Sequence, residues 1–372
     1  MNNYARKKKA DFWLALAIFA LVMFGIIAIY SVSKYYSLQI TDGETDRYYL
    51  VRQIIWAVIG LLAWAIVQSI DYSFWQKNTR AMFFITLILL VLPIFFGHQE
   101  SRSSTRWIGF GFANFQPSEL AKITLILYLS GWISNRQNQI STAKISINFF
   151  VFMAVVSLLM LIQKDLGTLA VMVGIAGAIY VISGAPTKYL FGGAGLAFLL
   201  AWLAIKIEPY RLKRLTTFLN PENDFWGTGY HIRNASIAIG SGGLFGLGFG
   251  QSKQKYLYLP EAHTDSIFAV VAEELGFLRA SLIIILLGFV AVRGYKIAKN
   301  APDTFSSLVA VGVTTWIIWQ AFINIGAMLS MLPLTGVPLP FLSYGGSSLV
   351  FLLIGVGILT NISKYSNISN RK

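Results

Sequence analysis

The sequence predicts an all-α, polytopic integral membrane protein with about ten transmembrane helices. Of its 372 residues, 56% are hydrophobic and only 12% are charged, whereas soluble proteins carry roughly twice that share of charge. The mean hydropathy is +0.62. Apolar runs of about 20 residues recur along the chain, and this length spans a bilayer core of roughly 30 Å. These observations exclude an ordinary water-soluble fold.

Each predicted span is an apolar stretch bounded by charged or turn-forming residues. The first follows Arg6–Lys9 as a signal peptide would, but its apolar part is too long and no small-residue cleavage site follows, so we interpret it as a retained span. The ten predicted spans are Phe12–Ser33, Val51–Ser69, Ala81–Gly97, Pro117–Ile133, Ile147–Ile162, Leu166–Ser183, Tyr189–Ile205, Ile267–Val292, Phe305–Leu329 and Phe341–Ile362.

The distribution of Lys and Arg predicts the orientation. With both termini in the cytoplasm, 15 of the 30 cations fall in inner segments and 6 in the short outer ones, as the positive-inside rule requires. A net charge of +14 would suggest nucleic acid in a soluble protein. Here the basic loops face anionic lipid, so we expect a membrane protein and no nucleic-acid partner.

One long hydrophilic segment, about residues 207–265, interrupts the spans on the outer side. It is rich in aromatic residues and Gly, so we expect short helices packed on the outer mouth of the bundle rather than disorder. We expect the whole chain, residues 1–372, to form a single transmembrane domain that includes this loop. The absence of Cys and the presence of only three His exclude disulfides, thiolate metal sites and histidine-rich metal centres.

Two charged residues at the start of the fourth span stand where charge is costly. Glu119 and Lys122 are spaced i, i+3, so they share a helix face and can pair. Charges at membrane depth usually face the bundle interior or a wet cavity. A structural ion pair and a polar cavity wall explain them equally well.

Other charged residues lie at the ends of spans. Asp165 precedes the sixth span, where an acid usually caps the helix N-terminus. Glu273 and Glu274, followed by Arg279, lie about two turns into the eighth span, and we expect ion pairing within or between helices there.

The densest polar cluster ends the long loop, from Lys253 to Asp265. Glu261, His263 and Asp265 alternate, so an extended strand would place all three on one face, which could bind a divalent cation. An N-cap role for Asp265 is a second interpretation. We favour a third, catalysis, because a carboxylate among cations at a lipid surface suits proton abstraction beside an anionic lipid-linked substrate.

Two irregular stretches have open interpretations. The Gly-rich run Gly240–Gly250 could cradle phosphate with its N–H groups or form a close-packed loop against membrane helices; it lacks the ending of a P-loop. Pro338–Ser348 is typical of an outer re-entrant turn that enters the last span, and such backbone survives at membrane depth only where protein or a water-filled cavity covers it.

Taken together and in order, several motifs resemble the SEDS family (shape, elongation, division and sporulation) of bacterial cell-wall proteins, RodA and FtsW. The run GSGGLFG at Gly240–Gly246 and the motif PEAHTD resemble the division member, FtsW, more than RodA, whereas GVPLP at Gly336–Pro340 is closer to RodA. The resembling motifs are QPSELAK at Gln116–Lys122, DLGT at Asp165–Thr168, Gly229–Gly250, LPEAHTD at Leu259–Asp265, EELG at Glu273–Gly276 and PFLSYGGS at Pro340–Ser347.

The resemblance implies a ten-span peptidoglycan glycosyltransferase that polymerises lipid II outside the plasma membrane. Its implied partners are a class B penicillin-binding protein and other divisome or elongasome membrane proteins. By motif, Asp265 matches the essential outer-loop acid, Glu119 and Lys122 match a functionally important pair, and Arg106 matches an arginine before the fourth span. The chain departs from the family pattern at four positions: Lys164, His231, Ser266 and Arg279.

The implied reaction needs a base for a sugar hydroxyl and positive charge for a departing diphosphate. We expect Asp265 to be the base, with its pKa held low by nearby cations. Mg²⁺ or Mn²⁺ could supply part of the positive charge. The candidate substrate-binding residues are Arg106, Glu119, Lys122, Asp165, Arg214, Lys255 and His263.

The favoured interpretation is a polymerase of septal (cell division) wall synthesis, and the nearest alternative is a RodA-type elongation polymerase. Two further alternatives come from other functional classes. A lipid II flippase or transporter would use Glu119 and Lys122 along a headgroup path, but the sequence shows no obvious pair of interrupted helices in repeated halves. A scaffold for a division complex would not need acids and bases gathered at one outer site.

Overall fold

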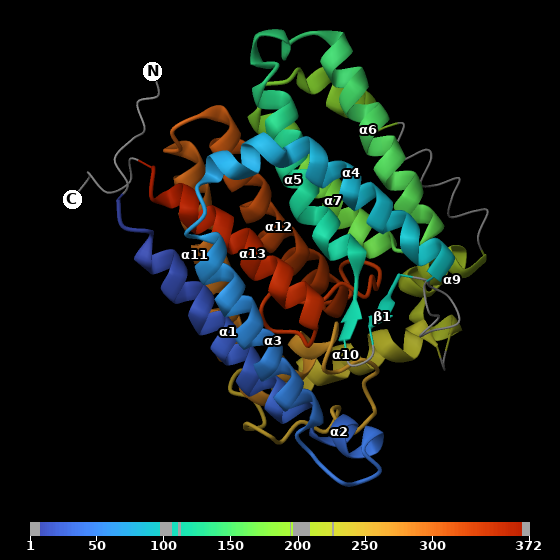
Figure 1. The fold of residues 1–372 in the computed structure, drawn as a ribbon. Helices are drawn as coiled ribbons and strands as arrows, with labels where there is room; N and C mark the ends of the chain where they lie inside the picture. The colour runs from blue at the N-terminus through green and yellow to red at the C-terminus, as the bar shows by residue number, and fades with distance from the viewer. Residues whose placement is uncertain are drawn as a thin grey trace.

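The computed structural model describes residues 8–96, 106–110, 113–193, 195, 209–224 and 227–366. They form a helical bundle with one small β-hairpin (Figure 1). Seven helices are long and apolar enough to cross a membrane, and α7 is a shorter apolar helix, which confirms the predicted multi-pass membrane protein. The elements are α1 Phe12–Val32, α2 Lys34–Ile40, α3 Tyr48–Val67, α4 Tyr72–Phe96, β1 Ile108–Phe110, β2 Ala113–Phe115, α5 Pro117–Ser134, η1 Gln137–Gln139, α6 Ala143–Ile162, α7 Leu166–Ile182, α9 Pro209–Leu219, η2 Pro221–Asn223, α10 Thr228–Gly242, α11 Ile267–Lys299, α12 Thr304–Met328 and α13 Gly346–Ser363.

Every predicted span except the seventh coincides with a helix. The seventh, Tyr189–Ile205, lies largely outside the described residues. The tenth begins later than predicted, at Gly346, because Phe341 has a φ of 66°, which a right-handed helix excludes. The predicted short helices of the long loop are α9 and α10.

Helix α12 is the centre of the bundle. It is buried along most of its length, and α5, α7, α11 and α13 pack around it. Its start is defined by a capping box, in which Asp303 accepts from the Ser306 N–H and Ser306 returns the contact. A helix that is apolar on all sides belongs in such a core, whereas α3, α4 and α6 leave apolar side chains exposed, as lipid-facing helices do.

The two ends of the bundle differ in character. At one end, which we call the Asp11 end, the Asp11 side chain caps α1 and pairs with Arg293 of α11, and the Asp11 main-chain N–H donates to the hydroxyl of Ser363 on α13. At the other, the Asp265 end, α2, the β-hairpin, α9 and α10 gather around the start of α11 (Figure 1). The chemistry of interest lies at this second end.

Helix α11 is broken at Gly276, whose φ and ψ are 77° and 174°. The Gly-rich turn after α10 fills the break. The N–H groups of Phe277 and Leu278 donate to the carbonyls of Gly243 and Leu244 at 2.8 and 3.2 Å. In return, the carbonyls of Glu273 and Glu274 each accept a bond of 3.0 Å from Leu247 and Gly248. Backbone groups freed by the break are therefore satisfied inside the protein.

Candidate active site

Asp265 lies at the end of the long loop, two residues before α11 begins. Its main-chain carbonyl accepts a bond of 2.7 Å from the side-chain amide of Asn324 on α12. Its carboxylate accepts from the Thr264 hydroxyl at 3.4 Å and faces Gly336, where an added Cβ would lie 3.6 Å from Oδ2. The carboxylate is partly buried, and its main chain is held by the core helix of the bundle.

The surroundings raise the pKa of Asp265 to about 7. Burial is the main cause, because it penalises the charged form, and the negative charge of Glu261 adds to it. The Thr264 hydroxyl and Arg106 act in the opposite direction. The expectation that nearby cations keep this pKa low is therefore wrong. Arg106 does lower the pKa, but burial and Glu261 raise it by more.

Arg106 interacts with both Asp165 and Asp265. Its Nη1 lies 3.4 Å from Oδ1 of Asp165, and its charge acts on Asp265. The Arg106 side chain retains 26% exposure, and its Nε has no hydrogen-bond partner among the described residues. A half-buried guanidinium with donors to spare is suited to binding an anion.

Asp165 caps α7, as predicted. Its carboxylate accepts from the N–H and hydroxyl of Thr168 at 3.1 and 2.9 Å and from the Gln116 amide at 3.1 Å. Because its acceptors are occupied by these groups and by Arg106, Asp165 orients Arg106 rather than offering a free charge. A direct role in substrate binding stays a prediction.

Glu119 and Lys122 form the predicted ion pair, with 2.8 Å between carboxylate and ammonium. Lys122 also donates to Oε1 of Gln320 at 2.9 Å and lies 4.9 Å from the centre of the Trp316 ring. Lys122 is only 1% exposed, so its charge is compensated inside the bundle. This geometry matches the structural ion pair, one of the two interpretations left open by the sequence.

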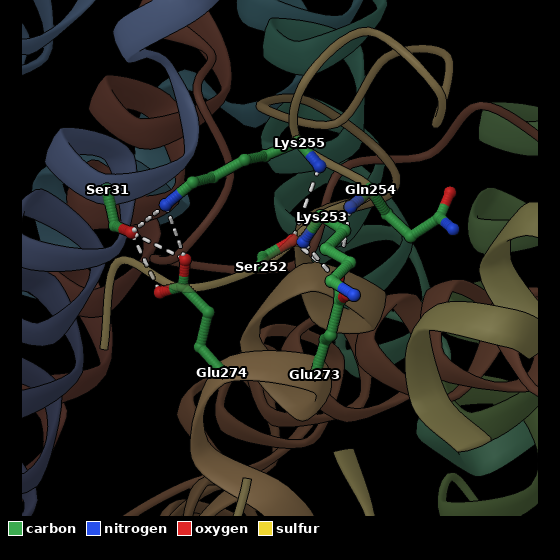
Figure 2. Close-up of polar contacts among 7 residues, drawn as sticks. All are labelled: Ser31, Ser252, Lys253, Gln254, Lys255, Glu273 and Glu274. Atoms are coloured by element: carbon green, nitrogen blue, oxygen red, sulfur yellow. Dashed lines mark hydrogen bonds and ion pairs between the residues drawn. The ribbon is translucent and has the colours of Figure 1, made fainter. Parts of the chain in front are cut away.

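Lys255 is also engaged in a buried pair. Its Nζ lies 2.8 Å from Oε1 of Glu274 and 3.3 Å from the hydroxyl of Ser31, which itself donates to Glu274 (Figure 2). Glu274 does form an ion pair, but with a lysine of the loop and not within or between helices as expected. Arg279 is not involved: it donates to the Phe245 carbonyl at 3.3 Å. The structure therefore does not present Lys255 as a free cation for diphosphate.

Glu273 anchors the same loop through different atoms. Its carboxylate accepts from the Ser252 hydroxyl and from the N–H groups of Lys253 and Gln254, the latter two at 3.0 and 3.4 Å (Figure 2). Adjacent glutamates of α11 therefore hold the turn at 252–255 from two sides. This arrangement fixes the start of the loop segment that ends at Asp265.

His263 is packed among aromatic rings rather than aimed at a substrate. Its ring centre lies 4.8 Å from Tyr36, 4.3 Å from Tyr49 and 5.7 Å from Tyr344. Burial lowers its pKa to about 4, although Glu261 opposes the shift. His263 is therefore neutral near pH 7 and cannot hold a phosphate by charge.

The predicted common face of Glu261, His263 and Asp265 is wrong. Glu261 has a φ of 51°, so the segment is a tight turn and not an extended strand; Glu261 is exposed while His263 is buried. Among the residues described, no three His, Asp or Glu side chains come together as metal ligands. Within the described part of the chain, the site therefore offers no cluster of three carboxylate or imidazole ligands for Mg²⁺ or Mn²⁺.

The Gly-rich run is a close-packed loop, the second of its two interpretations. The N–H groups of Gly246, Leu247 and Gly248 are bonded to backbone carbonyls, so they do not cradle phosphate. An added Cβ at Gly246 would lie 2.2 Å from the Glu274 carbonyl oxygen. Arg214 is the remaining candidate for substrate binding. Its backbone lies in α9, and its side chain is outside the described part of the structure.

The re-entrant segment before α13 is covered by protein, as predicted. Leu339 and Phe341 are buried, and the carbonyls of Val337 and Pro338 accept from Asn324 and Gln320 at 2.8 and 2.9 Å. These two amides were missed at the level of sequence. Uncharged amides four residues apart in an apolar helix were the available signal, because a buried amide must find partners.

A contact beside Asp265 was also missed. His231 Nε2 lies 2.6 Å from the hydroxyl of Ser266, and that hydroxyl donates to the carbonyl of Pro260 at 3.0 Å. With its only proton directed at Pro260, the Ser266 oxygen accepts from His231. The hydrogen bond joins two of the four positions at which the chain is expected to depart from the family pattern.

Residues 12–368 match a family model described as a cell cycle protein, FTSW_RODA_SPOVE. The chain belongs to this family. It is 39% identical to stage V sporulation protein E of Bacillus subtilis, covering 97% of this chain and 99% of that protein. It is 37% identical to a probable peptidoglycan glycosyltransferase FtsW of Trichlorobacter lovleyi, covering 96% and 94%.

Solved structures agree with this family membership. The chain is similar to one chain in a study of the structural coordination of polymerization and crosslinking by a peptidoglycan synthase complex, with a TM-score of 0.80 and 26% identity over 95% of this chain and 97% of that one. It is also similar to the rod shape determining protein RodA of Thermus thermophilus, with a TM-score of 0.71 and 25% identity over 96% and 98%. The expected SEDS-family membership, closer to FtsW, is confirmed.

Proposed function

We propose that this protein is a peptidoglycan glycosyltransferase that polymerises lipid II at the outer face of the plasma membrane, with Asp265 as its general base. The observation that carries the proposal is the Asp265 carboxylate itself, partly buried beside Arg106 with a pKa of about 7. A base works best when its pKa lies near the working pH. The names of the FtsW relatives support the same activity.

The reaction joins two lipid-linked sugars. As the 4-hydroxyl of the acceptor sugar attacks the anomeric carbon of the donor, the new glycosidic bond forms with inversion. The bond to the polyprenyl diphosphate breaks and that diphosphate leaves with the electron pair. Asp265 takes the hydroxyl proton. Arg106 is placed to stabilise the negative charge that develops on the diphosphate.

The other candidate residues divide by their contacts. Lys122 and Lys255 are neutralised by Glu119 and Glu274, so we assign them to positioning the site rather than to binding diphosphate. Asp165 orients Arg106. Arg214 remains a candidate for the second diphosphate.

We infer that the polymerase works with a crosslinking partner, a class B penicillin-binding protein. The similar chain in a complex that coordinates polymerization and crosslinking supports this inference. The distribution of Lys and Arg supports an orientation with both termini in the cytoplasm and Asp265 outside, where wall polymer is assembled. The FtsW relatives favour septal wall synthesis, with other divisome proteins as further partners.

A second setting for the same chemistry is sporulation. The relative with 39% identity is stage V sporulation protein E. Deleting the gene and recording whether cells fail to divide or fail to form spore wall separates the two settings. Loss of rod shape alone would favour a RodA-type elongation role.

The test of the activity is polymerisation of purified lipid II by the purified protein, with and without the penicillin-binding partner. Asp265→Ala and Asp265→Asn should abolish polymerisation while melting at the same temperature as the parent protein. Retained polymerisation by either variant would remove Asp265 from the role of base. Lipid II movement between leaflets of a vesicle without glycan formation would instead support a transporter.

A further inference from the structure

Asn324 is the one described side chain that joins the main chain of Asp265 to the core of the bundle. Its amide nitrogen donates to the Asp265 carbonyl at 2.7 Å and to the Val337 carbonyl at 2.8 Å. An amide nitrogen carries two protons, so both are used. The loop that carries Asp265 and the irregular segment before α13 are thereby held at one point of α12.

The orientation of this amide follows from its neighbours. Both contacts are carbonyl oxygens, which only the NH₂ group can satisfy, and turning the amide over would set oxygen against oxygen. The Asn324 oxygen has no hydrogen-bond partner among the described residues, and the side chain is only 1% exposed. A buried polar atom without a partner is costly, so stability alone does not explain Asn324.

One turn earlier on α12, Gln320 makes the equivalent contact. Its amide nitrogen donates to the Pro338 carbonyl at 2.9 Å, while its oxygen accepts from Lys122 at 2.9 Å and from Trp316 at 2.8 Å. Residues four apart share a helix face. The α12 face therefore connects the buried Glu119–Lys122 pair, the irregular segment and Asp265 through consecutive hydrogen bonds.

We propose that Asn324 is a positioning residue that holds the main chain of Asp265 against α12 and so sets where the Asp265 carboxylate lies in the site. The proposal rests on the proposed role of Asp265 as the base. Asn324 does not touch the carboxylate or a reacting atom. It acts through the Asp265 carbonyl.

Removing the Asn324 amide should change the pH dependence of the reaction, which the loss of a merely structural residue would leave unchanged. Released from α12, Asp265 gains water, and the burial that raises its pKa decreases. The charged and titratable groups that act on the carboxylate are Glu261 on its own loop, Arg106 before β1 and Tyr36 on α2. The acid limb of the rate profile of Asn324→Ala should therefore move below the parent midpoint, and kcat should fall more than KM rises.

A second readout reports the loop directly and needs no activity. The chain contains no Cys, so Ala262→Cys introduces a single thiol at a fully buried position of the same loop. Asn324→Ala should raise its rate of labelling by a water-soluble maleimide roughly tenfold, as expected for the loss of two hydrogen bonds. Asn324→Ser keeps one donor, so its labelling rate should lie between that of Ala262→Cys alone and that of Ala262→Cys with Asn324→Ala.

Asn361 offers a matched control. It too is 1% exposed, donates its amide to a backbone carbonyl, that of Gln68 at 2.9 Å, and leaves its oxygen without a partner among the described residues. It lies on α13 near the Asp11 end. Asn361→Ala should lower the melting temperature, as Asn324→Ala does, but it should change neither the labelling rate at residue 262 nor the pH midpoint.

The outcomes are distinct. Unchanged labelling and an unchanged midpoint in folded Asn324→Ala or Asn324→Ser would overturn the proposal, as would equal effects of Asn361→Ala. If Asp265→Ala still polymerises lipid II, the proposed function loses its base and this inference loses its catalytic meaning, whereas the labelling result would still report the anchor.

Discussion

Lys255 Nζ lies 2.8 Å from Glu274 Oε1, and this contact ties the loop that ends at Asp265 to the first half of α11. Both side chains are almost fully buried. Removing one member of such a pair leaves an uncompensated charge in a medium that solvates it poorly. The pair is therefore a stability element of the loop, which has consequences that can be measured.

Lys255→Met should destabilise the protein by roughly 3–5 kcal/mol, seen as a lower melting temperature in detergent. The double variant Lys255→Met with Glu274→Gln should recover most of the loss, because no unpaired charge remains. Lys213→Met is the control, since Lys213 pairs with Asp224 at the surface with 63% of its side chain exposed and should change little. Equal losses for Lys213→Met and Lys255→Met would contradict this account.

The pH dependence of polymerisation should report Asp265. Only its ionised form accepts a proton, so kcat/KM should rise with pH through a midpoint near 7. Glu261→Gln removes a charge that raises this pKa and should move the midpoint to lower pH. Rates measured between about pH 5 and 9 test both statements, and a parent midpoint near 4 would show that Asp265 is not buried as described.

Replacing Arg106 should act in the opposite direction. Arg106→Ala removes a charge that lowers the Asp265 pKa, so the midpoint should move to higher pH. The KM for lipid II should rise as well, because a donor for the diphosphate is lost. Arg106→Lys, which keeps the charge, should restore the midpoint but only part of the KM. A midpoint that stays in place in Arg106→Ala would separate Arg106 from Asp265.

Two groups of the same loop should act on stability in opposite directions as the pH falls. The pKa of His263 is 6.5 in the ordinary range and about 4 in the fold, so the contribution of His263 to stability is complete above about pH 6.5 and is lost as the pH falls toward 4, by at most roughly 3 kcal/mol. The pKa of Asp265 is raised from 3.8 to about 7, so its contribution has the opposite sign over the same range. Relative to the parent protein, His263→Phe should therefore shift the slope of the melting temperature against pH toward greater stability in acid, while an unaltered slope would place the effect elsewhere.

The break in α11 depends on glycine. At Gly276 an added Cβ would lie 2.2 Å from the Gly246 nitrogen, at a φ of 77°. Gly276→Ala should therefore cost about 1–3 kcal/mol from backbone strain, with a further loss from the contact. Gly288→Ala, in the same helix with nothing within 4 Å of the added atom, should be neutral or slightly stabilising. Similar melting temperatures for the two variants would show that the break tolerates a side chain.

The spans, the cap at Asp165 and the pairing of Glu119 with Lys122 were predictable because each depends on neighbours in sequence. Apolar length decides the first, and spacing of three residues the others. The partners of Asn324 and Lys255 were not predictable in this way. Asn324 reaches 59 residues back to Asp265, and only the packing of α12 against the loop brings them together.

The Gly-rich run shows a different limit. Its composition fits both a phosphate cradle and tight packing, since both need backbone without side chains. The tertiary contact with α11 distinguishes the two interpretations: the break at Gly276 leaves carbonyls and N–H groups unpaired, and the Gly-rich run forms hydrogen bonds with them. Likewise, the predicted low pKa of Asp265 counted the cations but not the burial, which a linear sequence does not display.

If α11 were continuous, a rotation of the helix at the Asp11 end would also rotate the residues next to Asp265. The break at Gly276, with φ of 77° and ψ of 174°, interrupts the helical hydrogen bonds that would couple the two parts of α11. Any coupling between the Asp11 end and the Asp265 end then has to run through α12 or through the Gly-rich turn that fills the break. The part of α11 before Gly276 is held instead by the Gly-rich turn and, through the Asp265 carbonyl, by Asn324 of α12.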